Sequence, residues 1–208
     1  RRRQPGALNG RSILVTGGAT PVAIDSVRQL TNRFSGATAV RIAQSLWQRG
    51  ANVSLLLGGA AVAAPAWLST QRVADFDAYS AACMSSEVDT GVFSAAVADY
   101  RPRTPSPGKL ASGVKDFVVE LEPTHKVIDA WHARFPDRRL VSFKLEVGLA
   151  TPELLEIAQR RLTRGSDVVV ANQLGGEGPR AFVVTRDQTH TVETTDLLAE
   201  VLADVLAG

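Results

Sequence analysis

Residues 11–18 have the sequence RSILVTGG, a short apolar run that ends on two glycines. The continuous apolar stretch at 13–15 has no polar alternation, which is typical of a strand buried on both faces of a sheet. Gly17 and Gly18 follow at once and indicate a tight turn. This segment therefore predicts a buried first strand, 11–16, that leads into a glycine turn.

Helical and strand patterns alternate along the rest of the chain. Apolar residues recur at helical spacing in 35–49, and Gly50 follows as a stop signal, so this segment predicts a helix. Thr151 is expected to cap a second long helix, with Pro152 in its first turn. The further predicted strands are 53–57, 72–74, 92–97, 117–121, 140–145 and 168–170. A final hairpin comprises 180–185 and 191–194. The predicted helices after 35–49 are 76–84, 124–134, 151–164 and 195–206.

This alternation predicts an α/β fold that is Rossmann-like, with a mainly parallel sheet, helices on both faces and a C-terminal β-hairpin. Segment 99–116 interrupts the pattern with prolines and glycines, and a loop of this length is usually functional or mobile. Ligands of such sheets bind outside the carboxyl ends of the strands. We therefore expect functional residues in the loops 17–32, 99–116 and 172–178.

Composition excludes several classes of protein. The chain has 208 residues, 45% of them apolar and 21% charged, which favours a folded domain over disorder. A formal net charge of +2 does not indicate a nucleic-acid-binding protein, and no apolar run approaches the roughly 20 residues that span a bilayer. Cys83 is the only cysteine, so no internal disulfide can form. We expect a cytoplasmic protein with a flexible tail or linker remnant at 1–8 and one domain at 9–208.

The glycine turn is the first candidate binding element, because amides at Gly17 and Gly18 could approach a phosphate closely. The turn does not match the dinucleotide fingerprint G-x-G-x-x-G, since Pro21 interrupts it, and no acidic residue follows the second strand. A nicotinamide-dependent short-chain oxidoreductase would also contain a Tyr-x-x-x-Lys pair. Neither Tyr79 nor Tyr100 has a lysine four residues later, so this enzyme class is an alternative with little support.

Polar residues before the first helix form a second candidate. Arg28 and Asn32 precede Ser35 and Gly36, where the helix is expected to begin. A helix amino terminus offers free amides and the positive end of a dipole to an anion. Simple capping of the helix by Asn32 or Ser35 explains the same residues without any ligand.

Small residues and a carboxylate follow the strand 92–97. Ala95 and Ala96 would let a ligand approach, and Asp99 stands at the carboxyl end of the strand. Lys109 lies in a loop rich in glycine and proline that could close over a phosphate. A lysine that only faces solvent is the alternative for this residue.

Further candidates lie in the second half of the chain. Arg160 and Arg164 are one helical turn apart and would share one helix face, although arginines on a surface helix are usually just solvated. Phe143 precedes charged residues at a strand end, and Asn172 begins an amide- and glycine-rich loop. The histidines show no metal-ligand spacing, and no G-x-S-x-G or Walker motif occurs.

Five segments taken together are more specific than any one of them. They are TGGATPVAIDSVR at 16–28, TNRFSG at 31–36, AAVAD at 95–99 with Lys109 after it, VSFKLE at 141–146, and VAN at 170–172. Their order and spacing resemble the phosphopantothenoylcysteine synthetase family over roughly residues 8–208.

The resemblance implies that 9–208 is a phosphopantothenate–cysteine ligase domain of coenzyme A biosynthesis. Family members activate the carboxylate of 4'-phosphopantothenate with a nucleoside triphosphate, which forms an acyl nucleotide and pyrophosphate, and the amine of cysteine then attacks the acyl carbon. CTP is favoured by family habit and ATP is the alternative. Mg²⁺ would bridge the phosphates without protein ligands. The resemblance also implies a homodimer and a flavin-dependent decarboxylase domain elsewhere.

The resemblance also implies roles for individual residues. Asn32 would engage the acyl intermediate and Lys109 would offset phosphate charge. Nucleotide binding is implied for Gly17, Gly18, Ala95, Ala96, Asp99, Glu122, Pro123, Thr124, His125, Phe143, Arg160 and Arg164. Substrate binding is implied for Arg28, Asn32, Ser35, Gly36 and Asn172.

The chain departs from the family pattern at three positions. Phe34 stands where a small polar residue is usual, and Arg160 and Arg164 stand where two lysines are common. Arginine keeps the charge of lysine but is bulkier and forked. These departures motivate a second alternative, a catalytically weak nucleotide-binding module of the same fold.

Overall fold

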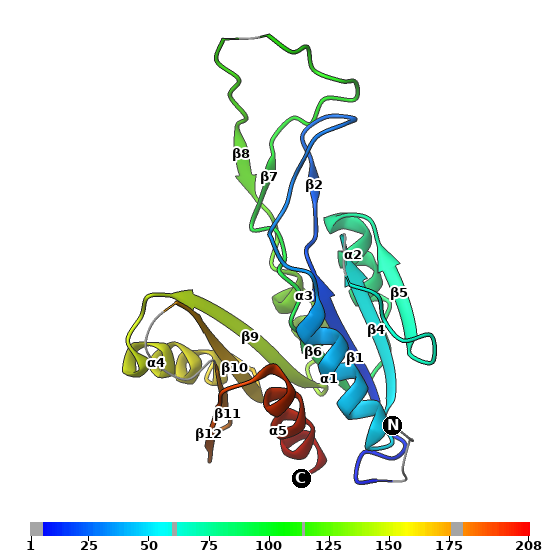
Figure 1. The fold of residues 1–208 in the computed structure, drawn as a ribbon, viewed down its shortest axis with the longest axis vertical. Coiled ribbons are helices and arrows are strands. Elements are labelled where there is room, and N and C mark those ends of the chain that lie inside the picture. The colour runs from blue at the N-terminus through cyan, green and yellow to red at the C-terminus, as the bar shows by residue number, and fades with distance from the viewer. Residues whose placement is uncertain (1–5, 60–61, 114, 176–180) are drawn as a thin grey trace.

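The computed structural model describes residues 6–59, 62–113, 115–175 and 181–208. Within these ranges an eight-stranded sheet forms the centre of the molecule (Figure 1). The strands from β10 to β5 run parallel, and β11 and β12 add an antiparallel hairpin. The predicted Rossmann-like sheet and C-terminal hairpin are confirmed. In spatial order the strands are β12 (Thr189–Val192), β11 (Ala181–Val184), β10 (Val168–Leu174), β9 (Arg139–Val147), β6 (Thr90–Phe93), β1 (Ser12–Gly18), β4 (Asn52–Gly58) and β5 (Ser69–Val73).

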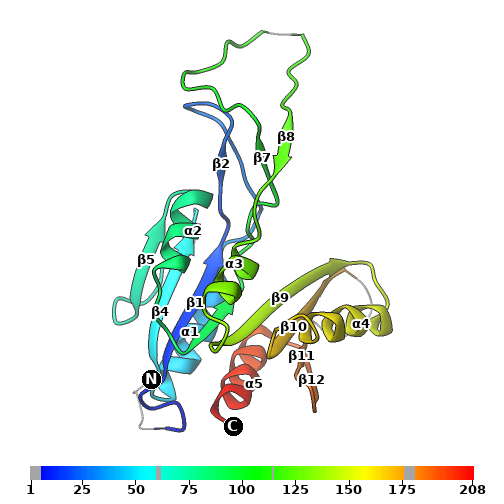
Figure 2. The ribbon, with the colours of Figure 1, turned by 180° about the vertical axis from the view of Figure 1, so that it is seen from behind.

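Helices cover both faces of the sheet, as predicted (Figures 1 and 2). α1 (Ala37–Gln48) and α5 (Thr195–Ala207) pack together on one face. α2 (Phe76–Met84), α3 (Val127–Arg134) and α4 (Thr151–Leu162) cover the other face. None of the helices in the described residues is long and apolar enough to cross a membrane.

The two-residue period of the strands produces these two cores. In β1, Ile13 and Val15 belong to the cluster under α1 and α5, whereas Leu14 belongs to the cluster under α2 and α3. All three side chains are at most 2% exposed. A strand without polar alternation is therefore buried on both faces, which explains why 13–15 can be uniformly apolar.

Two narrow ribbons project from the carboxyl edge of the sheet (Figures 1 and 2). β2 (Val22–Ala23) pairs with β3 (Gln29–Leu30), and β7 (Tyr100–Pro102) pairs with β8 (Leu121–Pro123), both antiparallel. β2 and β7 contact each other. We call these two ribbons, together with the loop 103–120, the arm.

The arm contains the largest errors of the sequence-based prediction. β2 and β3 were not predicted, because strands of two residues have no recognisable period. The strand predicted at 117–121 lies instead at Leu121–Pro123, where its backbone pairs with β7. Segment 99–116, predicted to be irregular, contains β7.

Smaller corrections concern element boundaries. The strand predicted at 92–97 ends at Phe93, and the third strand lies at Ser69–Val73 rather than 72–74. α3 begins at Val127, because Thr124 bonds to the chain after β6 instead of joining the helix.

The amino end of α4 also differs from the prediction. Ala150 is the N-cap residue, and its amide donates to the Glu153 carboxylate at 3.2 Å. Thr151 is therefore the first helical residue rather than the cap. At the other end the helix stops at Leu162 instead of 164.

The expected tail at 1–8 overlaps the packed domain. Leu8 is 2% exposed and belongs to the core under α1. Residues 1–5 lie outside the described residues. The body of the domain therefore includes Leu8, one residue before the predicted boundary.

Gly17 and Gly18, predicted to form a turn after the first strand, are instead the last two residues of β1, and they allow a very close approach of backbone segments. Gly18 has φ 77°, and a Cβ there would collide with the carbonyl oxygen of Gly58 in β4. A Cβ on Gly17 would collide with Ala39 of α1. These two glycines therefore let α1 and the end of β4 close on the end of β1.

Gly18→Ala is expected to lower the free energy of unfolding by about 3 kcal/mol or more, because the left-handed conformation costs about 1–2 kcal/mol and the collision adds to it. Gly10→Ala is the matched control, since Gly10 has φ 81° with open space around its Cβ position. It should cost only about 1–2 kcal/mol. Urea denaturation of both variants measures the difference, and equal losses would contradict the close-packing account.

Candidate functional site

A cavity of about 490 Å³ lies at the carboxyl ends of β6, β9 and β10. Its wall is formed by the segment after β6, the start of α3, the strand ends and the segment that leads into α1. Parallel strands bring their carboxyl ends to one edge of the sheet, so loops far apart in sequence meet there. The cavity occupies the place where ligands of this sheet class bind.

The backbone after β6 forms one side of the cavity in a fixed conformation. The amide of Ala96 donates to the carbonyl of Gly18 at 2.8 Å, and the amide of Ala98 donates to the hydroxyl of Thr20 at 2.9 Å. The hydroxyl of Thr124 donates to the carbonyl of Ala98 at 2.6 Å. The short side chains of this segment leave room for a ligand beside a rigid backbone.

Asn32 connects the segment before α1 to the same backbone. Its side-chain amide donates to the carbonyls of Ala96 and Val97 at 3.0 and 3.3 Å. The Nδ2 atom is thus held by the backbone, and the acceptor Oδ1 is the side-chain atom left to bind a ligand. Asn32 lines the cavity and is exposed.

Three cationic side chains lie around the cavity. Lys126 pairs with Asp99 at 2.5 Å, and Lys144 pairs with Glu146 at 2.9 Å. Arg161 reaches the cavity from α4, and burial lowers the pKa of its guanidinium. Arginine nevertheless keeps its charge in proteins. This arrangement suits a ligand with several negative charges.

Part of the wall is apolar and aromatic. Phe93, Phe143 and Tyr79 line it, and the Tyr79 hydroxyl donates to Thr16 at 3.2 Å. Burial raises the pKa of Tyr79 well above its usual value, so its hydroxyl stays neutral. A cavity lined by both apolar surface and cations can hold a ligand that has both a flat or aliphatic part and a charged part.

A cysteine and a histidine also lie at or near the wall. Cys83 is buried, and burial raises the pKa of its thiol to about 12, so it is no nucleophile at neutral pH. His125 lines the cavity, with Nε2 at 2.9 Å from the Ser80 hydroxyl and its ring edge-on to Phe76. These contacts orient the imidazole.

The cavity brings together eight of the residues that sequence reasoning proposed. They are Asn32, Ala95, Ala96, Asp99, Thr124, His125, Phe143 and Asn172. Residues from the segment before α1, the chain after β6, the turn before α3, the middle of β9 and the end of β10 therefore meet in one place.

Other proposed residues lie beside the cavity rather than in its wall. Gly17, Gly18 and Gly36 pack tightly around the end of β1, and Ser35 is exposed next to them. Glu122 and Pro123 belong to β8 in the arm, where Glu122 pairs with Arg101 at 2.9 Å.

The two proposed arginines of α4 do not share a helix face. Arg160 is 61% exposed in its side chain and lies 3.8 Å from Glu156, and Arg164 follows the helix, which ends at Leu162. Arg161 lines the cavity instead.

Helix phase could have identified Arg161 from the sequence. Leu154, Ala158 and Leu162 form the buried face of α4. At 100° per residue, Arg161 falls about 20° from Leu154, whereas Arg160 falls about 120° away. Lys126 was missed, although it stands near the start of a predicted helix at the carboxyl edge, whereas Lys144 is one of the charged residues noted after Phe143 and was given no role of its own.

Arg28 and Lys109 lie in the arm. The loop 103–120, which contains Lys109, forms the far end of the arm (Figure 1). Neither residue lines the cavity within one chain. Within the described residues, no three His, Cys, Asp or Glu side chains come together as a metal-binding group.

One family of known proteins matches nearly the whole chain. Residues 8–202 match the family described as DNA/pantothenate metabolism flavoprotein C-terminal domain. The coenzyme A biosynthesis bifunctional protein CoaBC of Thermococcus kodakarensis is 37% identical over 196 residues, which are 90% of this chain and 48% of that protein. The chain spans about half the length of the curated relatives it matches.

Two solved structures are similar over nearly the whole chain. The DNA/pantothenate metabolism flavoprotein from Streptococcus pneumoniae has a TM-score of 0.85 at 26% identity, covering 95% of this chain and 98% of that one. The C-terminal domain of the bifunctional protein CoaBC has a TM-score of 0.80 at 27% identity, covering 97% and 96%.

Proposed function

Because the chain belongs to the DNA/pantothenate metabolism flavoprotein C-terminal domain family, we propose that it is a phosphopantothenate–cysteine ligase, with CTP favoured over ATP as its co-substrate. The observation that carries this proposal is the position of Asn32. Its amide is bonded to the backbone of Ala96 and Val97 at a cavity with a cationic rim and an aromatic wall. The named relatives take part in coenzyme A biosynthesis, which fits the same reaction.

In the first step, a carboxylate oxygen of 4'-phosphopantothenate attacks the α-phosphorus of the nucleotide, and pyrophosphate leaves. Lys126, Lys144 and Arg161 stabilise the charge that develops on the phosphates. Phe143 and the small residues Ala95 and Ala96 accept the base and ribose. Preformed backbone and side-chain positions reduce the reorganisation that this step requires.

In the second step, the amine of cysteine attacks the acyl carbon, loses a proton and expels the nucleoside monophosphate. The free acceptor Oδ1 of Asn32 suits the N–H groups of the incoming amine. Ser35, Gly36 and Asn172 border the same region and are proposed to hold the pantothenate part. Phe34, which also lines the cavity, adds apolar surface there.

Mg²⁺ is proposed to enter with the nucleotide. In nucleotide sites this ion binds mainly through phosphates and water, with one or two carboxylates. Among the cavity-lining residues Asp99 is the carboxylate, and it is paired with Lys126, so the phosphates and water are proposed to hold the ion without a protein ligand. When bound, it would neutralise part of the triphosphate charge.

A second copy of the chain is the proposed partner. Large apolar side chains of the arm face solvent: Val27, Leu30, Tyr100, Phe117, Val118 and Leu121 are between 40% and 80% exposed. A homodimer through the arm would cover them and could bring Arg28 and Lys109 to the neighbouring cavity. A flavin-dependent decarboxylase domain elsewhere, and a cytoplasmic location, are further parts of the proposal.

Purified protein with Mg²⁺, 4'-phosphopantothenate, cysteine and CTP is expected to release pyrophosphate in a coupled assay, and ATP is tested in parallel. Omitting phosphopantothenate should abolish release, because its carboxylate is the nucleophile. No release with either nucleotide would sink the ligase proposal. Nucleotide binding by calorimetry without any release would favour the catalytically weak module.

Arg161→Gln is expected to weaken nucleotide binding about 10-fold or more, because a charge-assisted hydrogen bond contributes about 1.5–3 kcal/mol. Arg160→Gln, one residue away on the same helix, is the matched control and should change the dissociation constant less than about 2-fold. Calorimetric titration with CTP and Mg²⁺ measures both. The opposite ranking would favour the assignment of Arg160 and Arg164 to the triphosphate that the family resemblance implies.

Val118→Asp is expected to shift the chain toward monomer, since a carboxylate would be buried in the proposed interface. Val118 is 80% exposed in the single chain. Val147→Asp is the control, because Val147 is 70% exposed but lies at the end of β9, outside the arm. Sedimentation velocity reports the masses, and a wild-type monomer at high concentration would refute the dimer.

A further inference from the structure

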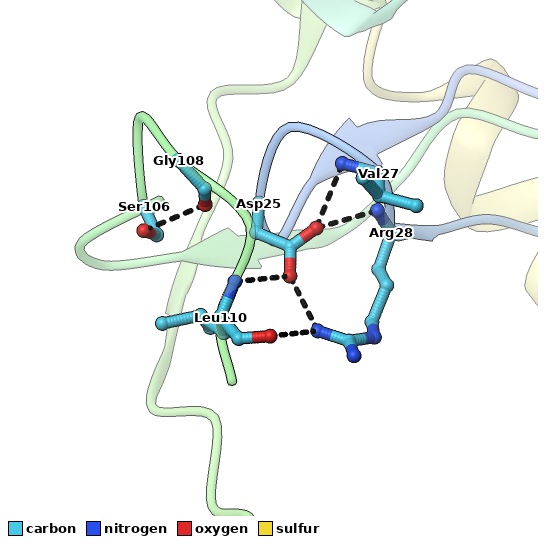
Figure 3. A network of polar contacts seen from close by, with 6 residues as sticks. All are labelled: Asp25, Val27, Arg28, Ser106, Gly108 and Leu110. Carbon is cyan, nitrogen blue, oxygen red and sulfur yellow. Dashed lines mark hydrogen bonds and ion pairs between the residues drawn. The ribbon is translucent and has the colours of Figure 1, made fainter. Parts of the chain in front are cut away.

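A network of hydrogen bonds at the arm joins the turn between β2 and β3 to the segment that contains Lys109 (Figure 3). The amide of Ser106 donates to the carbonyl of Ile24 at 3.0 Å. The amide of Leu110 donates to the Asp25 carboxylate at 3.2 Å, and Arg28 donates to the carbonyl of Leu110 at 3.3 Å. The segment 106–110 is thus attached at both of its ends.

Asp25 is the centre of this network. Its side chain is fully buried, which is unusual for a carboxylate in a projecting arm. Oδ1 accepts from the amides of Val27 and Arg28 at 2.8 and 2.7 Å, and so closes the turn. Oδ2 accepts from the Arg28 guanidinium at 2.6 Å and from the Leu110 amide. Oδ1 therefore acts within the turn, whereas Oδ2 also joins the turn to the loop 103–120.

The electrostatics keep Asp25 ionised. Burial by itself raises the pKa of this carboxyl, but the amides of Val27, Arg28 and Leu110 and the Arg28 guanidinium lower it, and the pKa falls to about 2. The carboxylate is therefore charged at any physiological pH, so its four hydrogen bonds do not depend on protonation in that range.

Lys109 lies between the two attachment points and is itself exposed. An ordered backbone on both sides limits where its ammonium group can reach. Arg28 is part of the same unit, and only its Nη1 atom is used in the two contacts with Asp25 and Leu110. The central carbon of the guanidinium also lies 5.9 Å from the centroid of the Phe117 ring, and Nε and Nη2 are donors that these contacts do not use for hydrogen bonds and that suit an anion.

We propose that Asp25 is a positioning residue that ties the Lys109 segment to the β2–β3 turn, so that Lys109 and Arg28 are presented to the substrates as one unit. This inference rests on the proposed ligase function. None of the roles implied by the family resemblance involves Asp25. The carboxylate acts through Lys109 and Arg28, without touching the reacting atoms itself.

Asp25→Asn separates the two tasks of the side chain. Asparagine retains an oxygen for the amides of the turn, but it places an NH₂ group against the Leu110 amide and the Arg28 guanidinium, which are both donors. Hydrogen exchange at the Leu110 amide should become about 10-fold faster or more, because the bond between the ribbons is lost. Unchanged exchange at Leu110 would overturn the proposal without any activity measurement.

A double-mutant cycle tests whether Asp25 acts through Lys109. Asp25→Asn is expected to lower kcat about 10-fold in the wild-type background, but less than about 2-fold in a Lys109→Gln background. Equal losses in the two backgrounds would show that Asp25 does not act through Lys109 and would overturn the inference. Glu120→Gln is the control, because Glu120 is an exposed arm carboxylate whose ion pair with Arg103 spans 3.9 Å.

Leu110→Pro covers the case in which Asp25→Asn fails to fold. It removes the amide that bonds to Oδ2 and keeps the Asp25 side chain, and it also restricts the backbone of the preceding residue, Lys109. As with Asp25→Asn, kcat is expected to fall when Lys109 is present and to change little in the Lys109→Gln background. A normal kcat would contradict the proposal. Hydrogen exchange tests the bond between Asp25 and Leu110 even if the wild-type chain releases no pyrophosphate. Failure of the ligase function and failure of this inference are therefore distinguishable.

Discussion

The close packing around the end of β1 is the constraint on which the rest of the structure depends. Gly17 meets Ala39 of α1, Gly18 meets Gly58 of β4, and the chain after β6 bonds to the same end through Ala96. There is no room for a Cβ at either glycine. The chain that follows β1 continues into the arm. The backbone after β6 forms a wall of the cavity, and its position is fixed before any ligand binds.

The polar contacts of the molecule differ in how easily a ligand can replace one of the partners. The carboxylate of Asp25 is buried and accepts four hydrogen bonds, so removal of its charge would leave buried donors without a partner. The pair of Asp99 and Lys126 is more than half exposed on both sides. Exposed pairs of this kind contribute little to stability, so a charged ligand can replace one partner at small cost.

The prediction from sequence succeeded where structure is local and failed where it depends on packing. The uniformly apolar run at 13–15 and the helix at 76–84 were recognisable from their own residues. β2 and β3 have two residues each, and they are strands only because the ribbons pair and pack on one another. In α4 the sequence predicted that arginine would face a ligand. The buried face of the helix decides which arginine does so, and it selects Arg161 over Arg160.

The sequence by itself determined the α/β class, the order of the strand-end motifs and the family, because hydrophobic period and short motifs are properties of neighbouring residues. It also identified Asn32, Asp99 and Phe143, which the sheet edge brings to one cavity. Only the tertiary structure decided which cations face that cavity, and that Lys109 is held in the arm by Asp25. The physical reason is that the bond from Leu110 to Asp25 joins residues 85 positions apart, and such contacts exist only once the ribbons are packed.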